Sequence, residues 1–597
     1  MTSSAETIIA RLKAYREDMK AAGVQASIVP RTDPHLSEYI SSHWHCVRYL
    51  TGFTGSAGTL VVTLDGAYLW VDSRYFLQGE QQTRGTGITL MKEGLPDTPT
   101  ITEFLLSTLK SGDTVGVDGM LLSVEGARSL KAALDAHDIK LKVDYTPMDR
   151  VWPDRPSLPQ GPVFIHDEKY AGESATSKLA TLRKDTAAAG AEAFFSSALD
   201  EIAWALNIRS TDVPCNPVAT SFLYVGPSEA VLFIDPAKMT PEAEAYLTAA
   251  GVTTRPYGDA LDYLRGVDRA TRVLLSGSKA SLGIMTALDG HYVIGESPLQ
   301  LPKAVKNATQ QKGIREAHVR DGAAMVRSIM EVKRIMNEGG HLTEIGVAEI
   351  LERNRRKDGL FFDLSFESIC GFGPNGAIVH YSATPESDTT LEMNNLLLID
   401  SGANYLDATT DITRTIALGT PSADMRHDFT LVMKGHIAIA TATFPAGTRG
   451  HQLDAMARMP LWKEGKSYLH GTGHGVGHFL NVHEGPQSIR LNDTMAPLMP
   501  GMLTSNEPGV YLEGRYGIRC ENLVLCVPAM TTEFGDFYCF ETVTLCPFDR
   551  ALFDTSIMTE AEIEWVNAYH ARVYTSLSPI LSDEERTWLA AACAPLD

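Results

Sequence analysis

Five side chains with metal-binding chemistry, spread between residues 400 and 521, most constrain how this chain can fold. They are Asp400, Asp411, His474, Glu507 and Glu521, and each ends or interrupts a distinct local motif. Carboxylates suit Mn²⁺ or Mg²⁺ and imidazole suits Zn²⁺, Mn²⁺ or Co²⁺, so the set fits two divalent ions. We therefore expect the fold to bring these distant segments together around one site.

The charge of such a site supports the presence of metal. Four ionised carboxylates in one cleft repel each other and resist burial unless cations offset their charge. In two-metal sites the ions acidify a shared water, so that a bridging hydroxide can attack a carbonyl, and they stabilise the tetrahedral intermediate. The pattern therefore predicts a two-metal hydrolase.

Size and composition narrow the other possibilities. A chain of 597 residues exceeds the usual single domain, so several cores are expected. The net charge of −21 argues against nucleic acid as a partner and gives no reason to expect binding to a membrane. The N-terminus lacks the apolar core of a signal peptide, so we expect a cytoplasmic protein. Eight cysteines without a Cys-x-x-Cys pair give no support for a zinc ribbon or a redox motif.

Helical and strand-like patterns alternate over most of the chain and predict an α/β architecture. A Pro-rich stretch at 146–162 has neither period and indicates a linker, and a long charged helix is expected over 311–333. We expect four segments, the first two being α/β domains, the third carrying every candidate ligand, and the last a helical C-terminal extension. Their borders are 1–155, 156–312, 313–550 and 551–597.

The two aspartates lie in a segment that reads as two strands joined by a turn at 402–404. Asp400 ends an apolar strand, and alternation places Asp411, Thr413 and Thr415 on one face of the next strand. A hairpin would bring the two carboxylates side by side. Either aspartate alone is more typical of a turn or a helix cap, so the combined set carries the argument.

The motif HGTGHGVGH holds His470, His474 and His478 between glycines, which let backbone approach a ligand closely. A phosphate-binding loop is an alternative, but the motif lacks the Gly-Lys-Ser/Thr ending and lies among acidic residues. A metal ligand with neighbouring histidines that hydrogen-bond a tetrahedral intermediate is the sharper hypothesis.

The two glutamates lie in different settings. Pro508 and Gly509 predict a turn directly after Glu507. Glu521 lies in a strand-like run with apolar neighbours, so burial is expected, and a buried glutamate needs a partner. Arg519 is two residues away, so it can pair with Glu521 or with another carboxylate of the site.

Several longer motifs carry a resemblance to a known family: FGPNGAIVHYSAT, HGTGHGVGHFLNVHEGP, GIRCENL, GFTGSAGT, VDSRYF and LDEIAWALNIRSTDVPCNPV. With them the chain resembles the pita-bread metallopeptidases, which include methionine aminopeptidase, prolidase and aminopeptidase P. It is most similar to the cytosolic three-domain Xaa-Pro aminopeptidases. The resemblance implies two related α/β domains of the creatinase/prolidase N-terminal type, followed by an α+β pita-bread catalytic domain with a helical C-terminal extension.

The resemblance also implies roles for single residues. The five ligands would hold two ions, with Asp411 and Glu521 bridging them. Glu507 would also take the proton of the attacking water and pass it to the leaving nitrogen. Catalytic help or substrate contact is implied for His380, His470, His474, His483 and, in the first domain, Arg74, with Arg519 in support.

The implied activity is hydrolysis of the bond between an N-terminal residue and proline in a peptide. Proline has no amide hydrogen and a fixed φ, so peptidases that recognise that N–H handle this bond poorly. Two ions per subunit are implied, Mn²⁺ first with Zn²⁺ or Co²⁺ as alternatives, together with a homodimer. A prolidase restricted to dipeptides and a non-enzymatic binding module are the competing hypotheses, and retention of all five ligands argues against the module.

Overall fold

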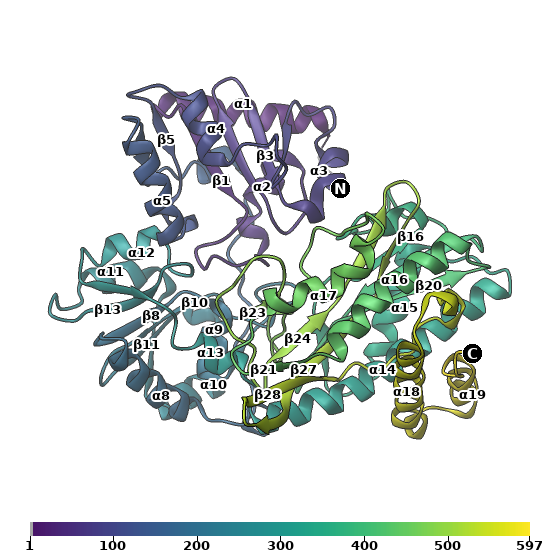
Figure 1. Cartoon of the computed structure of the whole chain (residues 1–597). Coiled ribbons are helices and arrows are strands. Elements are labelled where there is room, and N and C mark those ends of the chain that lie inside the picture. Colours follow the sequence, from purple (N-terminus) through teal and green to yellow (C-terminus); the bar gives the residue numbers. More distant parts are fainter. Residues whose placement is uncertain (1–3) are drawn as a thin grey trace. The chain divides into compact units, whose positions relative to one another are not determined.

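The computed structural model describes residues 4–597, which fall into two compact units (Figure 1). The first unit runs to Glu168 and includes Glu173–Gln300, and the second comprises Lys169–Gly172 and Leu301–Asp597. The finer division into four segments stays a prediction. None of the helices formed by residues 4–597 is both long and apolar enough to cross a membrane.

Within the described residues, the first unit contains two six-stranded sheets of the same topology. The first sheet has the order β4 (Thr89–Lys92), β3 (Ala67–Val71), β2 (Thr59–Thr63), β1 (Ala26–Pro30), β5 (Thr114–Gly116) and β6 (Lys140–Lys142). The second has the order β12 (Val252–Arg255), β11 (Ala230–Ile234), β10 (Ser221–Val225), β8 (Ala193–Ser196), β13 (Val273–Ser276) and β14 (Tyr292–Gly295). Equivalent neighbours also run in the same relative direction, so the two α/β domains are related as expected.

Local sequence explains the helices of this unit. The first helix, α1 (Ala5–Ala21), is capped by the Ser4 side chain and buries Ile8, Leu12 and Met19 at helical spacing. The other helices of six residues or more are α2 (Cys46–Thr51), α3 (Phe76–Thr83), α4 (Ile101–Thr108), α5 (Val124–Asp135), α8 (Ala175–Ala188), α9 (Leu199–Leu206), α10 (Pro241–Ala249), α11 (Ala260–Arg265) and α12 (Leu282–Ala287). The two sheets therefore alternate with helices, as the periodicity predicts.

The strands of the second unit form one large and several small sheets. The large sheet has the order β21 (Thr443–Pro445), β28 (Gly535–Thr542), β27 (Asn522–Thr532), β24 (Leu503–Asn506), β22 (Gly473–Gly475) and β23 (Glu484–Ile489). The small sheets are β16 (Ile369–Phe372), β17 (Asn395–Ser401) and β20 (Ile412–Leu418); β15 (Phe361–Leu364), β18 (Ala403–Tyr405) and β19 (Ala408–Thr409); and β25 (Gly509–Leu512) and β26 (Tyr516–Arg519). All candidate metal ligands lie in or next to these strands.

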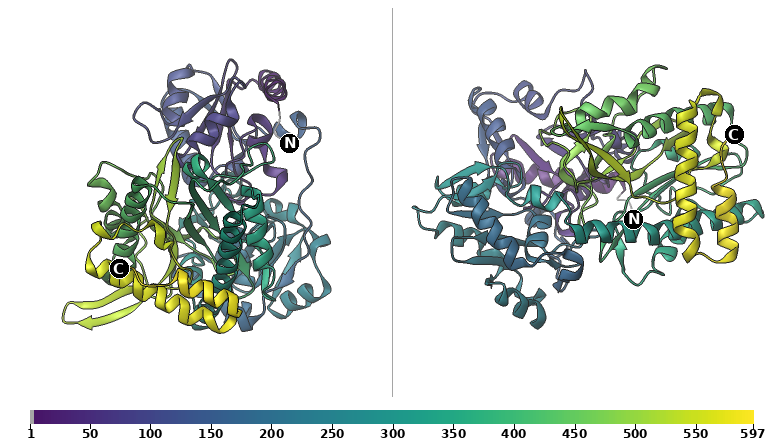
Figure 2. Two further views of the ribbon diagram at one scale, coloured as in Figure 1. Left: turned by 90° about the vertical axis from the view of Figure 1, so that its right-hand side faces the viewer. Right: turned by 60° about the horizontal axis from the view of Figure 1, so that its bottom comes forward.

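Helices complete the second unit. They are α13 (Gln300–Ala304), α14 (Ala308–Asn337), α15 (Glu344–Arg355), α16 (Ala423–Ala440), α17 (Gly450–Trp462), α18 (Glu560–Leu577) and α19 (Asp583–Ala592). Helix α14 begins before the expected residue 311 because Asn307 and Gln310 form a capping box. The C-terminal helices α18 and α19 lie side by side (Figure 2), and Arg327 of α14 pairs with Glu585 of α19 at 3.0 Å. Val566, Tyr569 and Leu589 of the extension are buried in one hydrophobic cluster with residues of α16, so the extension is part of the unit's core.

Two details of the expected strands are wrong. Strands β17 and β20 do pair, with Ser401 opposite Ile412, but the chain between them forms the small hairpin β18–β19, whose turn lies at 406–407 and not at 402–404. The expected strand through Glu521 is also interrupted, because β26 ends at Arg519 and β27 begins at Asn522. Both departures leave a carboxylate just outside a strand, where its position is set by the strands on either side.

Candidate metal centre

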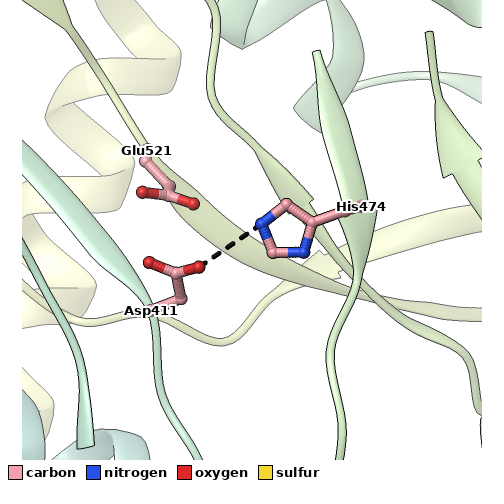
Figure 3. A group of neighbouring side chains, drawn as sticks. All are labelled: Asp411, His474 and Glu521. Atoms are coloured by element: carbon pink, nitrogen blue, oxygen red, sulfur yellow. Dashed lines mark ion pairs between the residues drawn. The ribbon is translucent and has the colours of Figure 1, made fainter. Parts of the chain in front are cut away.

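Three predicted ligands from three separate segments meet in the second unit (Figure 3). Asp411 directly precedes β20, His474 is the central residue of β22, and Glu521 lies between β26 and β27. Each offers one ligand atom, and these atoms all lie within 4.8 Å of one another. Asp411 Oδ2 lies 3.4 Å from His474 Nε2. The arrangement is compact enough for these side chains to share an ion.

Hydrogen bonds fix the orientation of His474. Its Nδ1 lies 2.9 Å from the carbonyl oxygen of Gly475, so Nδ1 carries the proton and donates to that oxygen. Its backbone N–H donates to Ser505 Oγ at 2.9 Å. The other ring nitrogen, Nε2, therefore faces the carboxylates of Asp411 and Glu507 and is the atom available to a metal.

The remaining two predicted ligands lie outside this group of three. Glu507 directly follows β24, and its Oε1 lies 3.3 Å from His474 Nε2. Asp400 accepts a hydrogen bond from Arg519 Nη2 at 2.6 Å through Oδ2. Its other oxygen, Oδ1, is buried and has no hydrogen-bond partner among residues 4–597. A buried carboxylate oxygen of this kind is one that a bound cation would satisfy.

The electrostatics of the site show an excess of buried negative charge. Burial, with contributions from Asp400 and Glu507, raises the pKa of Asp411 to about 6. Burial also raises the pKa values of Glu507 and Glu521, the latter well above its ordinary value. Burial opposes the charged form of His474, but the neighbouring carboxylates outweigh it and raise its pKa to about 9. Hard oxygen donors with one imidazole and surplus negative charge fit divalent cations.

Arg519 links the carboxylates to Thr413 and to Tyr511, a residue that the sequence did not single out. It donates to Asp400, to Thr413 Oγ1 at 3.2 Å and to Tyr511 Oη at 2.8 Å. Thr413 in turn donates to Glu521 Oε2 at 2.7 Å. Arg519 therefore pairs with Asp400 and reaches Glu521 only through Thr413. Tyr511 is new; it follows Glu507 by four residues in a short strand, a position that gives no sequence signal for a site.

The predicted histidines lie at different places around the candidate metal centre. The ring of His483 lies 4.4 Å from that of His474, and the ring of His380 lies 6.5 Å from that of His483, so His483 neighbours both other rings. His470 lies elsewhere around the centre, with Nε2 2.8 Å from Tyr511 Oη and Nδ1 4.0 Å from Glu507 Oε2. His478, the third histidine of the motif, is buried.

Arg74 belongs to the first unit, so its predicted contact with the substrate stays a prediction. It follows β3 and pairs with Asp72 at 2.7 Å and with Glu38 at 3.5 Å. These contacts hold the guanidinium within its own unit.

Comparison with known proteins decides the family. The model of metallopeptidase family M24 matches residues 312–528, and two models of the creatinase/prolidase N-terminal domain match 11–146 and 154–310. The C-terminal region of peptidase M24 matches 536–596. A probable Xaa-Pro aminopeptidase P of Laccaria bicolor is 43% identical, over 98% of this chain and 93% of that protein. The chain belongs to metallopeptidase family M24.

Other relatives place the chain more narrowly within M24. Aminopeptidase P2 of Arabidopsis thaliana is 40% identical over 96% of this chain and 86% of that protein. The crystal structure of an X-prolyl aminopeptidase from Caenorhabditis elegans, described as a cytosolic enzyme with a di-nuclear active site, matches with a TM-score of 0.96 and 34% identity. It covers 99% of this chain and 100% of that chain. The resemblance to three-domain Xaa-Pro aminopeptidases is thereby confirmed, as is the pita-bread fold with its creatinase-type N-terminal domains.

Proposed function

We propose that this M24 chain is a metal-dependent aminopeptidase that cleaves the bond between an N-terminal residue and a following proline. The observation that carries the proposal is the meeting of Asp411, His474 and Glu521 beside Glu507. The full-length similarity to proteins named Xaa-Pro aminopeptidase P supports it.

We propose that two divalent ions would be held by Asp400, Asp411, His474, Glu507 and Glu521. Mn²⁺ fits this oxygen-rich set best, and Zn²⁺ or Co²⁺ are the alternatives. When bound, such ions polarise the scissile carbonyl and lower the pKa of a water molecule. The di-nuclear site of the C. elegans relative supports two ions rather than one.

Glu507 is the proposed proton carrier. It directly follows β24, its side chain is 17% exposed, and it accepts a hydrogen bond from Ser505 Oγ at 3.1 Å, so its carboxylate is held in place. Glu507 takes a proton from the attacking water as the new C–O bond forms. It then passes the proton to the proline nitrogen as the C–N bond breaks, because the secondary amine leaves readily only when protonated.

Substrate contacts are proposed for His474, His483 and His380. The N–H groups of His483 and His380 can donate to the carbonyl oxygen as it gains negative charge, which stabilises the transition state more than the ground state. His470 is proposed to assist from beside Glu507. Arg74 is proposed to reach the substrate from the first unit.

The specificity of the proposed reaction depends on recognition of the substrate's proline. Proline lacks an amide hydrogen and its ring fixes φ, so a site can recognise the ring itself rather than an N–H. The substrates are therefore expected to be peptides with proline at the second position.

We also propose that the chain forms a homodimer in the cytosol. The relative from C. elegans is described as cytosolic. Met459 and Trp462 of α17 and the nearby Leu469 are exposed, and exposed apolar side chains of this size favour association. Light scattering on the purified protein would measure the mass of the particle, and a mass equal to one chain would contradict the dimer.

The decisive experiment measures hydrolysis of three peptides, Arg-Pro-Pro, Arg-Pro and Arg-Ala-Ala, by metal-stripped protein with and without added Mn²⁺. Metal-dependent release of arginine from Arg-Pro-Pro, slower release from Arg-Pro and none from Arg-Ala-Ala is the expected result. Cleavage of Arg-Pro alone would instead indicate a dipeptidase. No cleavage of any peptide by the metal-loaded protein would rule out the proposed activity.

A further inference from the structure

Glu484 lies between two buried lysines of the second unit. Its Oε2 accepts a hydrogen bond from Lys303 Nζ at 2.6 Å, and its Oε1 accepts one from Lys306 Nζ at 2.5 Å. The three side chains are at most 3% exposed. We call this group the Lys303–Glu484–Lys306 clamp. It holds each carboxylate oxygen separately, so the carboxylate cannot rotate without breaking a charged contact.

The lysines of the clamp are anchored to the framework. The backbone N–H of Lys306 donates to the carbonyl oxygen of Gly501 at 2.9 Å, and its Nζ also donates to the carbonyl oxygen of Lys303 at 3.1 Å. Gln311 of α14 donates to the carbonyl oxygen of Lys306 at 2.8 Å. The cationic half of the clamp is therefore fixed by the start of α14 and by Gly501, two residues before β24.

The other half of the clamp lies next to the candidate metal centre. Glu484 is the first residue of β23 and pairs with Gly475 of β22. A Cβ atom at Gly475 would lie 2.4 Å from the carbonyl oxygen of Glu484, so only glycine permits this approach of the strands. His483 precedes Glu484 and His474 precedes Gly475, and the two imidazole rings lie 4.4 Å apart with their planes at 75°. Clamping Glu484 thus fixes the backbone from which His483 projects.

We propose that Glu484 is a positioning residue whose two lysine contacts hold the His483 ring at its place beside His474. The inference rests on the proposed role of His483 in contacting the substrate. A purely stabilising role explains the clamp less well, because buried ion pairs are on average no more stabilising than apolar residues of similar size. A fixed orientation, by contrast, matters wherever a side chain must meet a substrate accurately.

The variant Lys303→Met tests this proposal. It removes one lysine but leaves Glu484 paired with Lys306, so Glu484 keeps a charged partner. We expect kcat/KM for Arg-Pro-Pro to fall roughly 10- to 100-fold, the order expected when a contacting group is displaced. The matched control is Lys333→Met in α14, which loses a contact to Asp549 at 2.6 Å in the same unit and should keep the wild-type kcat/KM.

A double-mutant cycle separates positioning from stability. In the His483→Ala background, Lys303→Met should cause no further fall in kcat/KM, because the group it positions is already gone. An equal fall in both backgrounds, or no fall in wild type, would overturn the proposal. Unchanged kcat/KM in His483→Ala alone would overturn the role of His483 and the positioning proposal together, while metal-dependent turnover would still uphold the proposed activity.

A second variant keeps the proposal testable when Lys303→Met does not fold. Lys303→Arg keeps the positive charge but changes its reach, and circular dichroism would report whether each variant is folded. We expect a smaller fall in kcat/KM for Lys303→Arg than for Lys303→Met, again absent in the His483→Ala background. When Lys303→Met does not fold, a folded Lys303→Arg with the wild-type kcat/KM, or with an equal fall in both backgrounds, would contradict the proposal.

Discussion

Two groups of buried carboxylates in the second unit differ in their charge balance. Asp321 of α14 accepts hydrogen bonds from Arg355 Nε at 2.7 Å and from Tyr405 at 2.9 Å, and although burial opposes its charge, Arg355 keeps its pKa below the ordinary value. At the candidate metal centre, burial raises the pKa values of Asp411, Glu507 and Glu521.

The difference teaches how to distinguish a structural pair from a binding site. A carboxylate with its own arginine is satisfied within the protein. The metal centre sets four carboxylates against Arg519 and His474, so its charge is balanced only when cations from solution are added. Changes that alter the balance in each group test this comparison.

The largest effect is expected from Glu507→Gln. The amide keeps the size of the side chain but cannot accept a proton, so kcat for Arg-Pro-Pro should fall by about 10²- to 10⁴-fold. Metal analysis of the purified variant is the control, because some bound metal should remain. Wild-type kcat in a metal-loaded Glu507→Gln protein would remove Glu507 from the proposed reaction.

The next largest effect is expected when the buried pair of Asp321 and Arg355 is broken. Arg355→Met leaves Asp321 buried without its cation, which should destabilise the protein by about 3–5 kcal/mol. Replacing both partners, by adding Asp321→Leu, should recover much of that loss. Denaturant unfolding measures both free energies. The increase in melting temperature on adding Mn²⁺ should be the same as in wild type, and loss of that increase would show that the two groups are not independent.

Removal of one carboxylate from the metal centre should raise the stability of the metal-free protein and reduce the stability gained by binding Mn²⁺. Metal-free Glu521→Gln should melt above metal-free wild type, because one repelling charge is gone. The gain from Mn²⁺, about 2.7 kcal/mol at a hundredfold excess over Kd in wild type, should shrink. Thermal melts with and without chelator measure both. A metal-free variant less stable than metal-free wild type would contradict the charge excess.

The smallest effect is a pH dependence of the metal-free protein. Asp411 has a pKa of about 6 when folded and an ordinary pKa of 3.8, so between these values the folded state binds more protons than the unfolded state. Stability from this group is present below pH 4 and is lost as pH rises through 6, by on the order of 2 kcal/mol. Asp411→Asn should lack this loss. Parallel melting curves of the two proteins from pH 4 to 7 would contradict the prediction.

The sequence by itself determined the parts of this protein that depend on local chemistry. Strands β1, β10 and β11 coincide with short runs of strand-like, mostly apolar residues. The candidate ligands were recognisable because each ends or interrupts a distinct local motif with a charged or imidazole side chain. The predicted face shared by Thr413 and Thr415 is confirmed, since Thr413 donates to Glu521 and Thr415 to the carbonyl oxygen of Arg519.

Only the tertiary structure decided which of these groups touch each other. Nothing local to Arg519 states that it pairs with Asp400, 119 residues away, rather than with Glu521. The contact between Lys303 and Glu484 spans 181 residues. A sequence pattern reports the period and polarity of one segment, whereas the partner of a buried charge depends on how separate segments pack and on which charges then lack compensation.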